Sequence, residues 1–399
     1  MPLCERVKTA MYWFAAASLT PAILLMVACL WGGPWPLVAL GCITGFVMLV
    51  DRFWPGEMRL RDDPGAKRFA RRLSVLLALV HFIVLPLGIW AMAAAPWLSP
   101  GQALAVGIAL GMFMGQVSNS NAHELIHAPS RGLRLLGVAV YISLLFGHHA
   151  SAHPKVHHVH VATDRDPNSA NLGVGFYRFW PRAWIGSFIA GLRAENAVRA
   201  RRDPSPPMPS HPYVAYCVGA LLALGAGFAL AGWTGVSVYI ALTMYAQMQL
   251  ILADYVQHYG LRRAQRADGR VEPAGARHSW NAAPWYSAAM MLNAPHHSDH
   301  HMHPMRVFPA LRLDRDMPVL PFSLPVMAII ALSPTLWRRV MDPRVAAWGE
   351  AQAVGGVGDS DLALSGHATD MDDSSGPGGV DGPDGRVGIG PIDNVSRGV

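Results

Sequence analysis

Long apolar stretches dominate this chain, and they alternate with short turns or with longer polar segments. Six stretches are long enough to cross the roughly 30 Å hydrocarbon core of a bilayer as helices. They cover residues 11–31, 34–50, 73–95, 101–122, 212–233 and 236–257. Short turns rich in Gly and Pro join the members of each consecutive pair, which is typical of helical hairpins. The pattern therefore predicts an all-α fold, a bundle of six transmembrane helices arranged as three hairpins.

Two apolar stretches need separate treatment. The first span follows Arg6 and Lys8 and so has the basic start of a signal peptide. No small-residue cleavage site ends it and another span follows at once, so we expect it to stay as a membrane helix. The stretch Val319–Trp337 is also apolar, but three prolines interrupt it. We expect an interfacial or re-entrant helix there rather than a seventh span.

Composition and charge support a multispanning membrane protein. Hydrophobic residues make up 52% of the 399 residues and charged residues 15%, with a mean hydropathy of +0.25. All 32 Lys and Arg lie outside the spans and the short turns, in residues 1–8, 52–72, 131–202 and 262–397. Loops rich in these residues stay on the cytosolic side. We therefore expect a protein of the inner (plasma) membrane with both termini in the cytosol.

The net charge of +6 then describes a positive cytosolic surface. Such a surface suits anionic lipid headgroups or an acidic partner, although orienting the spans explains the same residues equally well. It gives no reason to expect nucleic acid as a partner.

The composition changes near Gly349. Residues 351–399 contain eight acidic residues, two Arg and few large apolar side chains. A segment of this kind cannot bury enough surface to order itself. We therefore expect a membrane domain over residues 1–345 and a disordered tail over residues 346–399, in which His367 has no role.

Histidines recur with similar spacing at span ends and in the polar segments that follow. Three boxes and one single residue contain them: His123-Glu-Leu-Ile-His127, His153-Pro-Lys-Val-His157-His158, His297-Ser-Asp-His300-His301, and His258 at the end of the sixth span. An H-x-x-x-H spacing puts both rings on one helix face, and neutral imidazole is a common metal ligand. The set predicts a histidine-rich metal centre that caps the bundle on the cytosolic side.

The first box alone also matches the H-E-x-x-H signature of zinc metalloproteases, in which Glu124 would be the general base. A hydrolytic zinc site uses three protein ligands, which would leave at least six clustered histidines unexplained. A two-metal oxidative centre would use them all. We therefore expect Glu124 to accept a proton from a ligating imidazole or a neighbouring group. Asp254, an intramembrane acid one turn before His258, is a second candidate catalytic residue.

Other polar residues flank the boxes and have weaker signals. For three of them ligation and a hydrogen-bonding role both remain open: His148, His149 and His160. Two more are expected at the surface or in support of the ligands: His296 and His303. A polar turn can supply hydrogen-bond partners to ligating imidazoles: Asp164, Asp166 and Asn168.

The cysteines bear on the source of electrons. Cys4 is expected in the cytosol, the other three lie in apolar spans, and the sequence has no C-x-x-C pair. This excludes a built-in rubredoxin-like or iron–sulfur carrier. No G-x-G-x-x-G follows a plausible strand, which argues against a flavin or nicotinamide domain. A redox enzyme with this sequence must receive its electrons from another protein.

In these motifs the chain resembles the membrane-bound non-haem di-iron alkane hydroxylases (alkane 1-monooxygenases), within the membrane fatty acid desaturase and hydroxylase superfamily. The resemblance covers about residues 10–345 and rests on the histidine boxes. Two further elements favour the hydroxylase branch over ordinary desaturases: Val161-Ala-Thr-x-x-Asp166-Pro after the second box, and His258-Tyr-Gly-Leu261.

The resemblance implies two irons held by nine histidines. In this chain they correspond to His123, His127, His153, His157, His158, His258, His297, His300 and His301. It also implies hydroxylation of the terminal methyl of an alkane-like substrate that enters from the lipid, with O2 as oxidant. Electrons would come from rubredoxin or ferredoxin and its reductase.

The chain departs from the family pattern near the boxes. Ala128 stands where the family has a basic residue, and Ala152 and Gln257 stand where it has Glu. Ala294-Pro-His precedes the last box in place of Leu-Gln-Arg. All nine corresponding histidines are present, so metal binding is expected, while the substrate and the electron donor are left open.

Several alternatives remain. A related di-iron enzyme would desaturate or hydroxylate an acyl lipid, or hydroxylate an aryl methyl group or a carotenoid. An intramembrane zinc protease and a metal transporter are non-redox alternatives, but a transporter needs polar groups in mid-span, where only Asp254 and His81 qualify. Five residues are candidates to line a substrate pocket, although packing explains each more simply: Trp54, Met112, Phe113, Met244 and Met248.

Overall fold

The structure is a computed structural model, and it describes residues 3–54, 56, 60, 62–204 and 206–365. Helices provide nearly all of the regular structure in these residues. Two isolated β-bridges, Gln265–Val271 and Asn281–Val319, are the strand-like pairs found there. One compact unit spans Met1–Trp348 and a second spans Gly349–Val399. The all-α prediction is confirmed.

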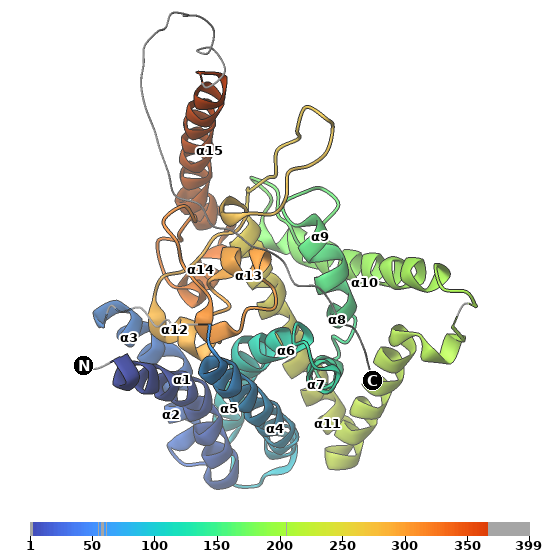
Figure 1. Ribbon diagram of the computed structural model, residues 1–399. Coiled ribbons are helices and arrows are strands. Elements are labelled where there is room, and N and C mark those ends of the chain that lie inside the picture. Colours follow the sequence, from blue (N-terminus) through green and yellow to red (C-terminus); the bar gives the residue numbers. More distant parts are fainter. Residues whose placement is uncertain (1–2, 55, 57–59, 61, 205, 366–399) are drawn as a thin grey trace, which may run out of the picture. The chain divides into compact units, whose positions relative to one another are not determined.

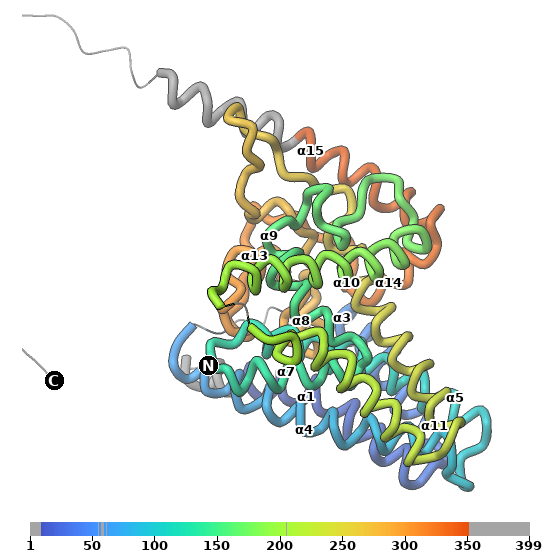
Figure 2. The backbone as a smooth tube through the Cα atoms, turned by 90° about the vertical axis from the view of Figure 1, so that its right-hand side faces the viewer, coloured from blue at the N-terminus to red at the C-terminus, as the bar shows by residue number. Residues whose placement is uncertain are grey.

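Five helical segments are long and apolar enough to cross a membrane: Thr9–Trp31, Trp35–Phe53, Pro64–Ala94, Pro100–Ile126 and Pro212–His258. They contain α1 (Leu3–Trp31), α2 (Trp35–Gly41), η1 (Cys42–Phe46), α3 (Val47–Phe53), α4 (Pro64–Ala94), α5 (Pro100–Phe113), η2 (Met114–Ser118), α6 (Asn119–Ile126) and α11 (Pro212–His258). Figures 1 and 2 show these helices side by side in one layer. The prediction of a multispanning membrane protein is confirmed.

The expected count of six spans is not confirmed as such, because α11 is assigned as one helix of 47 residues. Its backbone leaves the helical region at Ala231 and at Gly232, where φ is +60°. Gly235 then lies against Gly227, so close that a Cβ on Gly235 would be 2.2 Å from the Gly227 carbonyl oxygen. The chain therefore reverses at Gly232, and α11 contributes two arms of a hairpin (Figure 1).

The third span begins earlier than expected. Helix α4 starts at Pro64, whereas the apolar pattern predicted residue 73. Asp63 caps it by accepting a hydrogen bond from the Ala66 N–H at 2.8 Å. The additional turns contain Lys67, Arg68, Arg71 and Arg72, so a hydropathy pattern alone leaves them out of the span.

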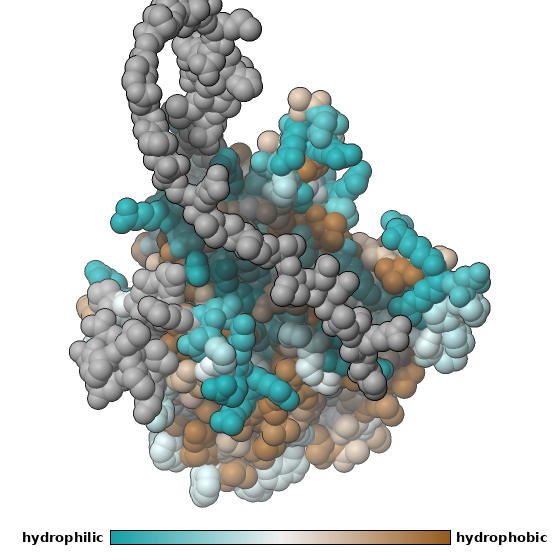
Figure 3. Space-filling model, in the orientation of Figure 1, coloured by the Kyte–Doolittle hydropathy of each residue, from teal (hydrophilic) through white to brown (hydrophobic). Residues whose placement is uncertain are grey.

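The first two hairpins are tied together at their turns. The Trp97 indole N–H donates to the Cys29 carbonyl at 3.1 Å, and the Gln102 amide donates to the Gly33 carbonyl at 2.8 Å. The reversal of α11 lies at the same end of the bundle in Figures 1 and 2. In Figure 3 the surface around these helices is mostly hydrophobic. Their exposed face is therefore suited to lipid.

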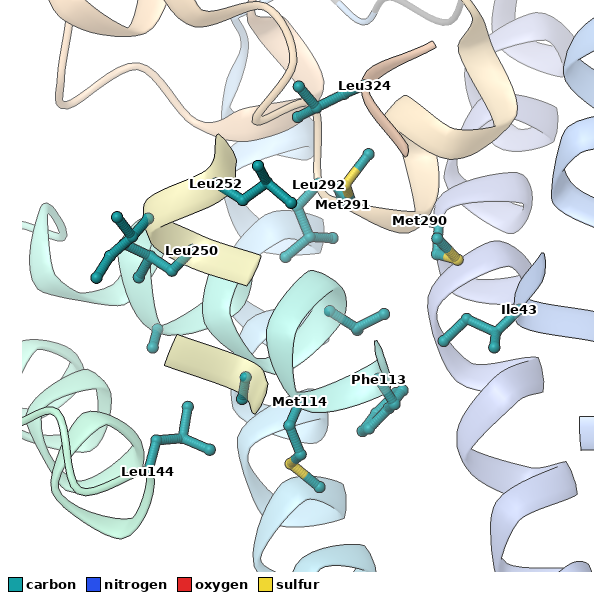
Figure 4. Packing of buried hydrophobic residues seen from close by; sticks show 14 of the residues in the cluster. Ile43, Phe113, Met114, Leu144, Leu250, Leu252, Met290, Met291, Leu292 and Leu324 are labelled. Atoms are coloured by element: carbon teal, nitrogen blue, oxygen red, sulfur yellow. The ribbon is translucent and has the colours of Figure 1, made fainter. Parts of the chain in front are cut away.

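Shorter elements cover the opposite end of the bundle. They are α7 (Arg131–Ser143), α8 (His149–Ala152), η3 (His153–His157), α9 (His158–His160), α10 (Phe176–Ala200), η4 (Met208–Ser210), η5 (Ala276–His278), α12 (Trp285–Met290), α13 (His297–Met302), η6 (Phe308–Ala310) and α14 (Leu324–Ala331). The hydrophobic core continues into this layer, because Leu252 of α11 lies next to Met291 and Leu292 in Figure 4. The layer is thus packed directly on the helix ends.

The apolar stretch Val319–Trp337 contains α14, which has only eight residues and is too short to span a bilayer. Helix α15 (Pro334–Ser365) follows and runs past residue 345, where the tail was expected to begin. Four alanines among residues 346–353 favour the helix in the first turns of this region. Residues 366–399, including His367, lie outside the described residues, and their disorder stays a prediction.

Candidate metal centre

Helix ends supply three of the predicted ligands. His123 lies in the last turn of α6, His127 is its C-terminal cap, and His258 is the last residue of α11. The polar residues Asn119 and Asn121 precede the first box and are buried. The apolar segments Pro100–Ile126 and Pro212–His258 thus end in imidazoles where the bundle meets the covering layer.

The second box lies in a wide π-helical turn, η3, in which the N–H of His158 bonds to the carbonyl of His153. This five-residue turn brings the ring nitrogens of His153 and His158 within 2.9 Å of each other. His157, one residue before His158, points to a different set of rings. A regular helix would instead have paired His153 with His157.

The structure brings all nine predicted histidines together, in two groups of converging nitrogens. We call the first the five-histidine group: His123, His127, His153, His158 and His300. We call the second the four-histidine group: His157, His258, His297 and His301. Within each group one ring nitrogen of every residue lies within 4.8 Å of the others.

Distances between ring nitrogens fit a metal ion inside each group. In the five-histidine group, Nε2 of His153 lies 2.7 Å from Nε2 of His123 and 2.9 Å from that of His158. In the four-histidine group, Nε2 of His297 lies 3.0 Å from that of His258 and 3.1 Å from that of His301. Nitrogens about 2.1 Å from one ion and at right angles are about 3 Å apart.

Unpartnered nitrogens in both groups also fit metal binding. Nε2 of His127 and Nε2 of His157 are buried and have no hydrogen-bond partner. A buried imidazole nitrogen without a partner is costly unless something else occupies it. The donor set is entirely imidazole, which suits a transition metal such as iron, copper or zinc.

Burial favours the neutral form of most of these imidazoles. It lowers the pKa of His127 to about 4, with a further contribution from His157, and it lowers the pKa of His153 and His300 well below the ordinary range. His157 differs: burial acts to lower its pKa, but the neighbouring Asp166 carboxylate outweighs it, and the pKa is raised. Neutral rings can bind a metal without first losing a proton.

Asp166 orients His157, which agrees with the polar turn expected after the second box. Its Oδ2 atom lies 2.9 Å from Nδ1 of His157 and accepts a hydrogen bond from the Ser169 hydroxyl at 2.7 Å. Nδ1 is thereby fixed as the protonated nitrogen, so Nε2 is free to bind a metal. Nδ1 of His258 similarly lies 3.4 Å from the His278 carbonyl oxygen.

Replacing Asp166 by Asn is expected to weaken metal binding at the four-histidine group by about 10- to 100-fold, because the carboxylate that orients His157 is lost. Titration of the metal-free protein with Fe²⁺ or Co²⁺ measures this. Asp164→Asn is the matched control, since that side chain is 90% exposed and pairs with Arg262. Equal affinities for the two variants would contradict the role of Asp166.

The two acids that the sequence singled out have different surroundings. Glu124 accepts a hydrogen bond from the Phe308 backbone N–H at 3.3 Å, which is a neighbouring group rather than a ligating imidazole, and its catalytic role stays a prediction. Asp254 is buried and accepts from the Asn168 side-chain amide at 2.6 Å. The Asn168 backbone N–H donates to Asp166, so Asp254 is linked to His157 through this turn.

The flanking histidines belong to neither group. His148 packs against Trp184 and Phe188, and His149 stacks on Phe146. His303 is half-exposed and lies 3.0 Å from the Asp299 carboxylate. The other two also lie outside the groups: His160 and His296.

Sequence reasoning missed Asp299, although it lies inside the third box. This carboxylate is 1% exposed, forms an ion pair with Arg306, and accepts a hydrogen bond from the Arg312 backbone N–H at 2.9 Å. It therefore fastens α13, which carries three of the histidines, to the segment that follows. The sequence did offer one signal for this role, an acidic residue placed between the histidines of the third box.

A partly open cavity runs from the histidines between η2, α6 and α11. Its wall includes His123, His153 and His297 at one end and Gly115, Gln116 and Gln249 at the other. None of the five residues expected to line a pocket is in this wall. Phe113 is fully buried in the core, while Trp54 and Met244 are 72% and 52% exposed.

Comparison with known proteins gives consistent matches. The family model described as fatty acid desaturase matches residues 96–329. Alkane 1-monooxygenase 1 of Pseudomonas aeruginosa is 35% identical over 60% of this chain and 63% of its own length, slightly less than two thirds. Alkane 1-monooxygenase 2 of the same organism is 29% identical over 84% of this chain and 88% of its own. Alkane 1-monooxygenase of Ectopseudomonas oleovorans is 32% identical over 77% of this chain and 80% of its own.

Proposed function

Because the chain belongs to the fatty acid desaturase family and, within it, to the alkane hydroxylases, we propose that it is a membrane monooxygenase acting on an alkane-like substrate. It would hydroxylate the terminal methyl group of that substrate with O2. The observation that carries this proposal is the convergence of nine histidines in two groups beside a cavity between membrane helices.

We propose that each histidine group holds one iron ion. Nine imidazoles are far more than the three ligands of a catalytic zinc site, which argues against an H-E-x-x-H protease. When bound, an iron pair supplies the activation of O2 that breaking an unactivated C–H bond requires, which acid–base side chains cannot provide. The five- and four-histidine groups are the sites that would receive these ions.

The side chains of the protein would hold the substrate and exclude water. The cavity has Leu250, Leu252 and Met291 in its wall, so an alkyl chain can lie there in contact with apolar groups. Its histidine end would receive the terminal methyl group. Asp166 and Asp254 would act indirectly, by keeping the four-histidine group in position through His157.

Electrons would come from a separate rubredoxin or ferredoxin and its reductase. The missing C-x-x-C pair and the missing nucleotide-binding motif support an external electron source, and the family resemblance implies that it is one of these proteins. The location would be the inner membrane, with both termini and both histidine groups in the cytosol. The distribution of Lys and Arg supports that orientation, since the three tight turns have none.

The purified protein is expected to contain two irons per chain. Cells that also express a rubredoxin and its reductase should convert n-alkanes to 1-alkanols, identified by mass spectrometry. A panel of fatty acids and methylarenes in the same cells separates the related reactions. One zinc per chain together with proteolysis, or desaturated acyl products with no alcohol, would contradict the proposal.

A further inference from the structure

Two glutamines lie at the end of the cavity away from the histidines, and hydrogen bonds fix how they are oriented. Gln249 of α11 donates through Nε2 to the Gly111 carbonyl at 2.9 Å. Its Oε1 atom accepts from Nε2 of Gln116 at 3.3 Å. Oε1 of Gln116 is then left buried and without a hydrogen-bond partner.

The assignment of oxygen and nitrogen in these amides follows from the bonding pattern. A backbone carbonyl is only an acceptor, so Gln249 must present its NH2 group to Gly111 and its oxygen to Gln116. Gln116 must therefore present its own NH2 group to Gln249. Both glutamines line the cavity, and the free oxygen of Gln116 is an acceptor buried within this wall.

A second acceptor lies one turn nearer the histidines. Asn119 is 6% exposed, it lines the same cavity, and its Oδ1 atom has no hydrogen-bond partner. Two buried acceptors on one wall are unfavourable beside an alkane, which offers them no donor. A ligand that carries an O–H or N–H group removes that penalty at one of them.

We propose that this cavity binds an amphiphilic chain with a hydrogen-bond donor at one end, of the class of long-chain primary alcohols. The hydroxyl donates to Oε1 of Gln116 while the far methyl group points to the histidines. Gln116 precedes His123 by seven residues, roughly 10 Å of helix, so the alkyl chain spans that length. A carboxylate or an ester is disfavoured, because its oxygens only accept.

This proposal rests on the proposed function and narrows its substrate to molecules that already carry an alcohol. In the reaction a terminal C–H bond breaks and a C–O bond forms, which converts the alcohol to an α,ω-diol. One oxygen atom of O2 enters the product. The other is reduced to water by two protons and by two electrons from the redox protein of the proposed function.

Binding to the full-length protein tests the donor directly and needs no turnover. Decan-1-ol and 1-methoxynonane are isomers, but only the alcohol can donate a hydrogen bond. Displacement of radiolabelled decan-1-ol from the protein in nanodiscs should give a Kd about tenfold lower for the alcohol than for the ether. Equal affinities, the result expected if bound water satisfies Gln116, would overturn the proposal.

Substitutions test whether Gln116 causes the difference in affinity between the alcohol and the ether. Gln116→Leu should bring the two affinities close together, and Gln249→Leu, which removes the partner that orients Gln116, should reduce the difference partially. Met244→Leu is the control, since Met244 is on the same helix as Gln249 but exposed and outside the cavity wall. A preference for the alcohol that persists in Gln116→Leu would contradict this site. If a variant fails to fold, the comparison of the two isomers on the unaltered chain still tests the proposal.

Turnover separates this proposal from the proposed function. Decan-1-ol should give decane-1,10-diol with a kcat/KM about tenfold above that for 1-methoxynonane. If decane is hydroxylated but the alcohol has no advantage over the ether, the donor site is wrong and the proposed function stands. If no compound is oxidised, the proposed function fails, and the binding comparison still decides the donor site.

Discussion

Replacing His297 by Ala is expected to abolish metal binding at the four-histidine group and to lower hydroxylation by at least about 100-fold. His297 is central to that group, since its Nε2 lies 3.0 Å from that of His258 and 3.1 Å from that of His301. Removing it leaves three imidazoles, and His301 loses its nearest ring nitrogen. Metal content measured by mass spectrometry should fall from two ions per chain to one or fewer, together with product formation.

His160→Ala is the matched control for this experiment. His160 lies close to the second box in sequence but belongs to neither histidine group, so the variant should keep both ions and normal turnover. If His297→Ala retained two ions and full activity, the assignment of ligands would be wrong. Loss of both properties in His160→Ala would show that the effect is not specific to the groups.

Asp299→Ala is expected to destabilise the protein by about 2–4 kcal/mol, because it leaves the largely buried guanidinium of Arg306 without its partner. Asp299 is 1% exposed and pairs with Arg306, whose side chain is 15% exposed. The same carboxylate accepts from the Arg312 backbone, so the substitution also releases the segment after α13. Thermal unfolding in detergent, followed by fluorescence-detected gel filtration, should show a lower Tm and reduced metal content.

Asp268→Ala provides the comparison for that substitution. Asp268 is exposed and accepts one hydrogen bond, from the Arg270 backbone N–H at 2.9 Å. Its removal should change the free energy of unfolding by less than about 1 kcal/mol. A similar Tm for the two variants would contradict the structural role of Asp299.

The sequence predicted the membrane helices and the convergence of the histidines for clear physical reasons. Apolar length determines whether a helix can span lipid, and nine imidazoles at ligand spacing have few other uses. The division of the histidines could not be predicted. It depends on the π-helical turn η3, which places His153 and His158 together and His157 in the other group.

The prediction of the cavity wall failed for a different reason, because its residues were chosen by type alone. Met112 and Phe113 were chosen as large apolar residues of the fourth span, and neither lines the cavity. Gln116 and Asn119, which line the cavity, are polar residues in an apolar span and were the better signal. Asp299 was overlooked for another reason, because its partner Arg306 lies beyond the box and no spacing rule connects them.

Adjacent histidines in two boxes bind in different groups: His157 and His158, and likewise His300 and His301. In each pair, one peptide bond therefore links a residue of the five-histidine group to a residue of the four-histidine group. Because successive side chains on a helix diverge by about 100°, backbone geometry would set the separation of two ions bound in these groups. Among the described residues both groups contain imidazoles only, so under the proposed function the polypeptide would hold the spacing of a dimetal unit without a shared carboxylate.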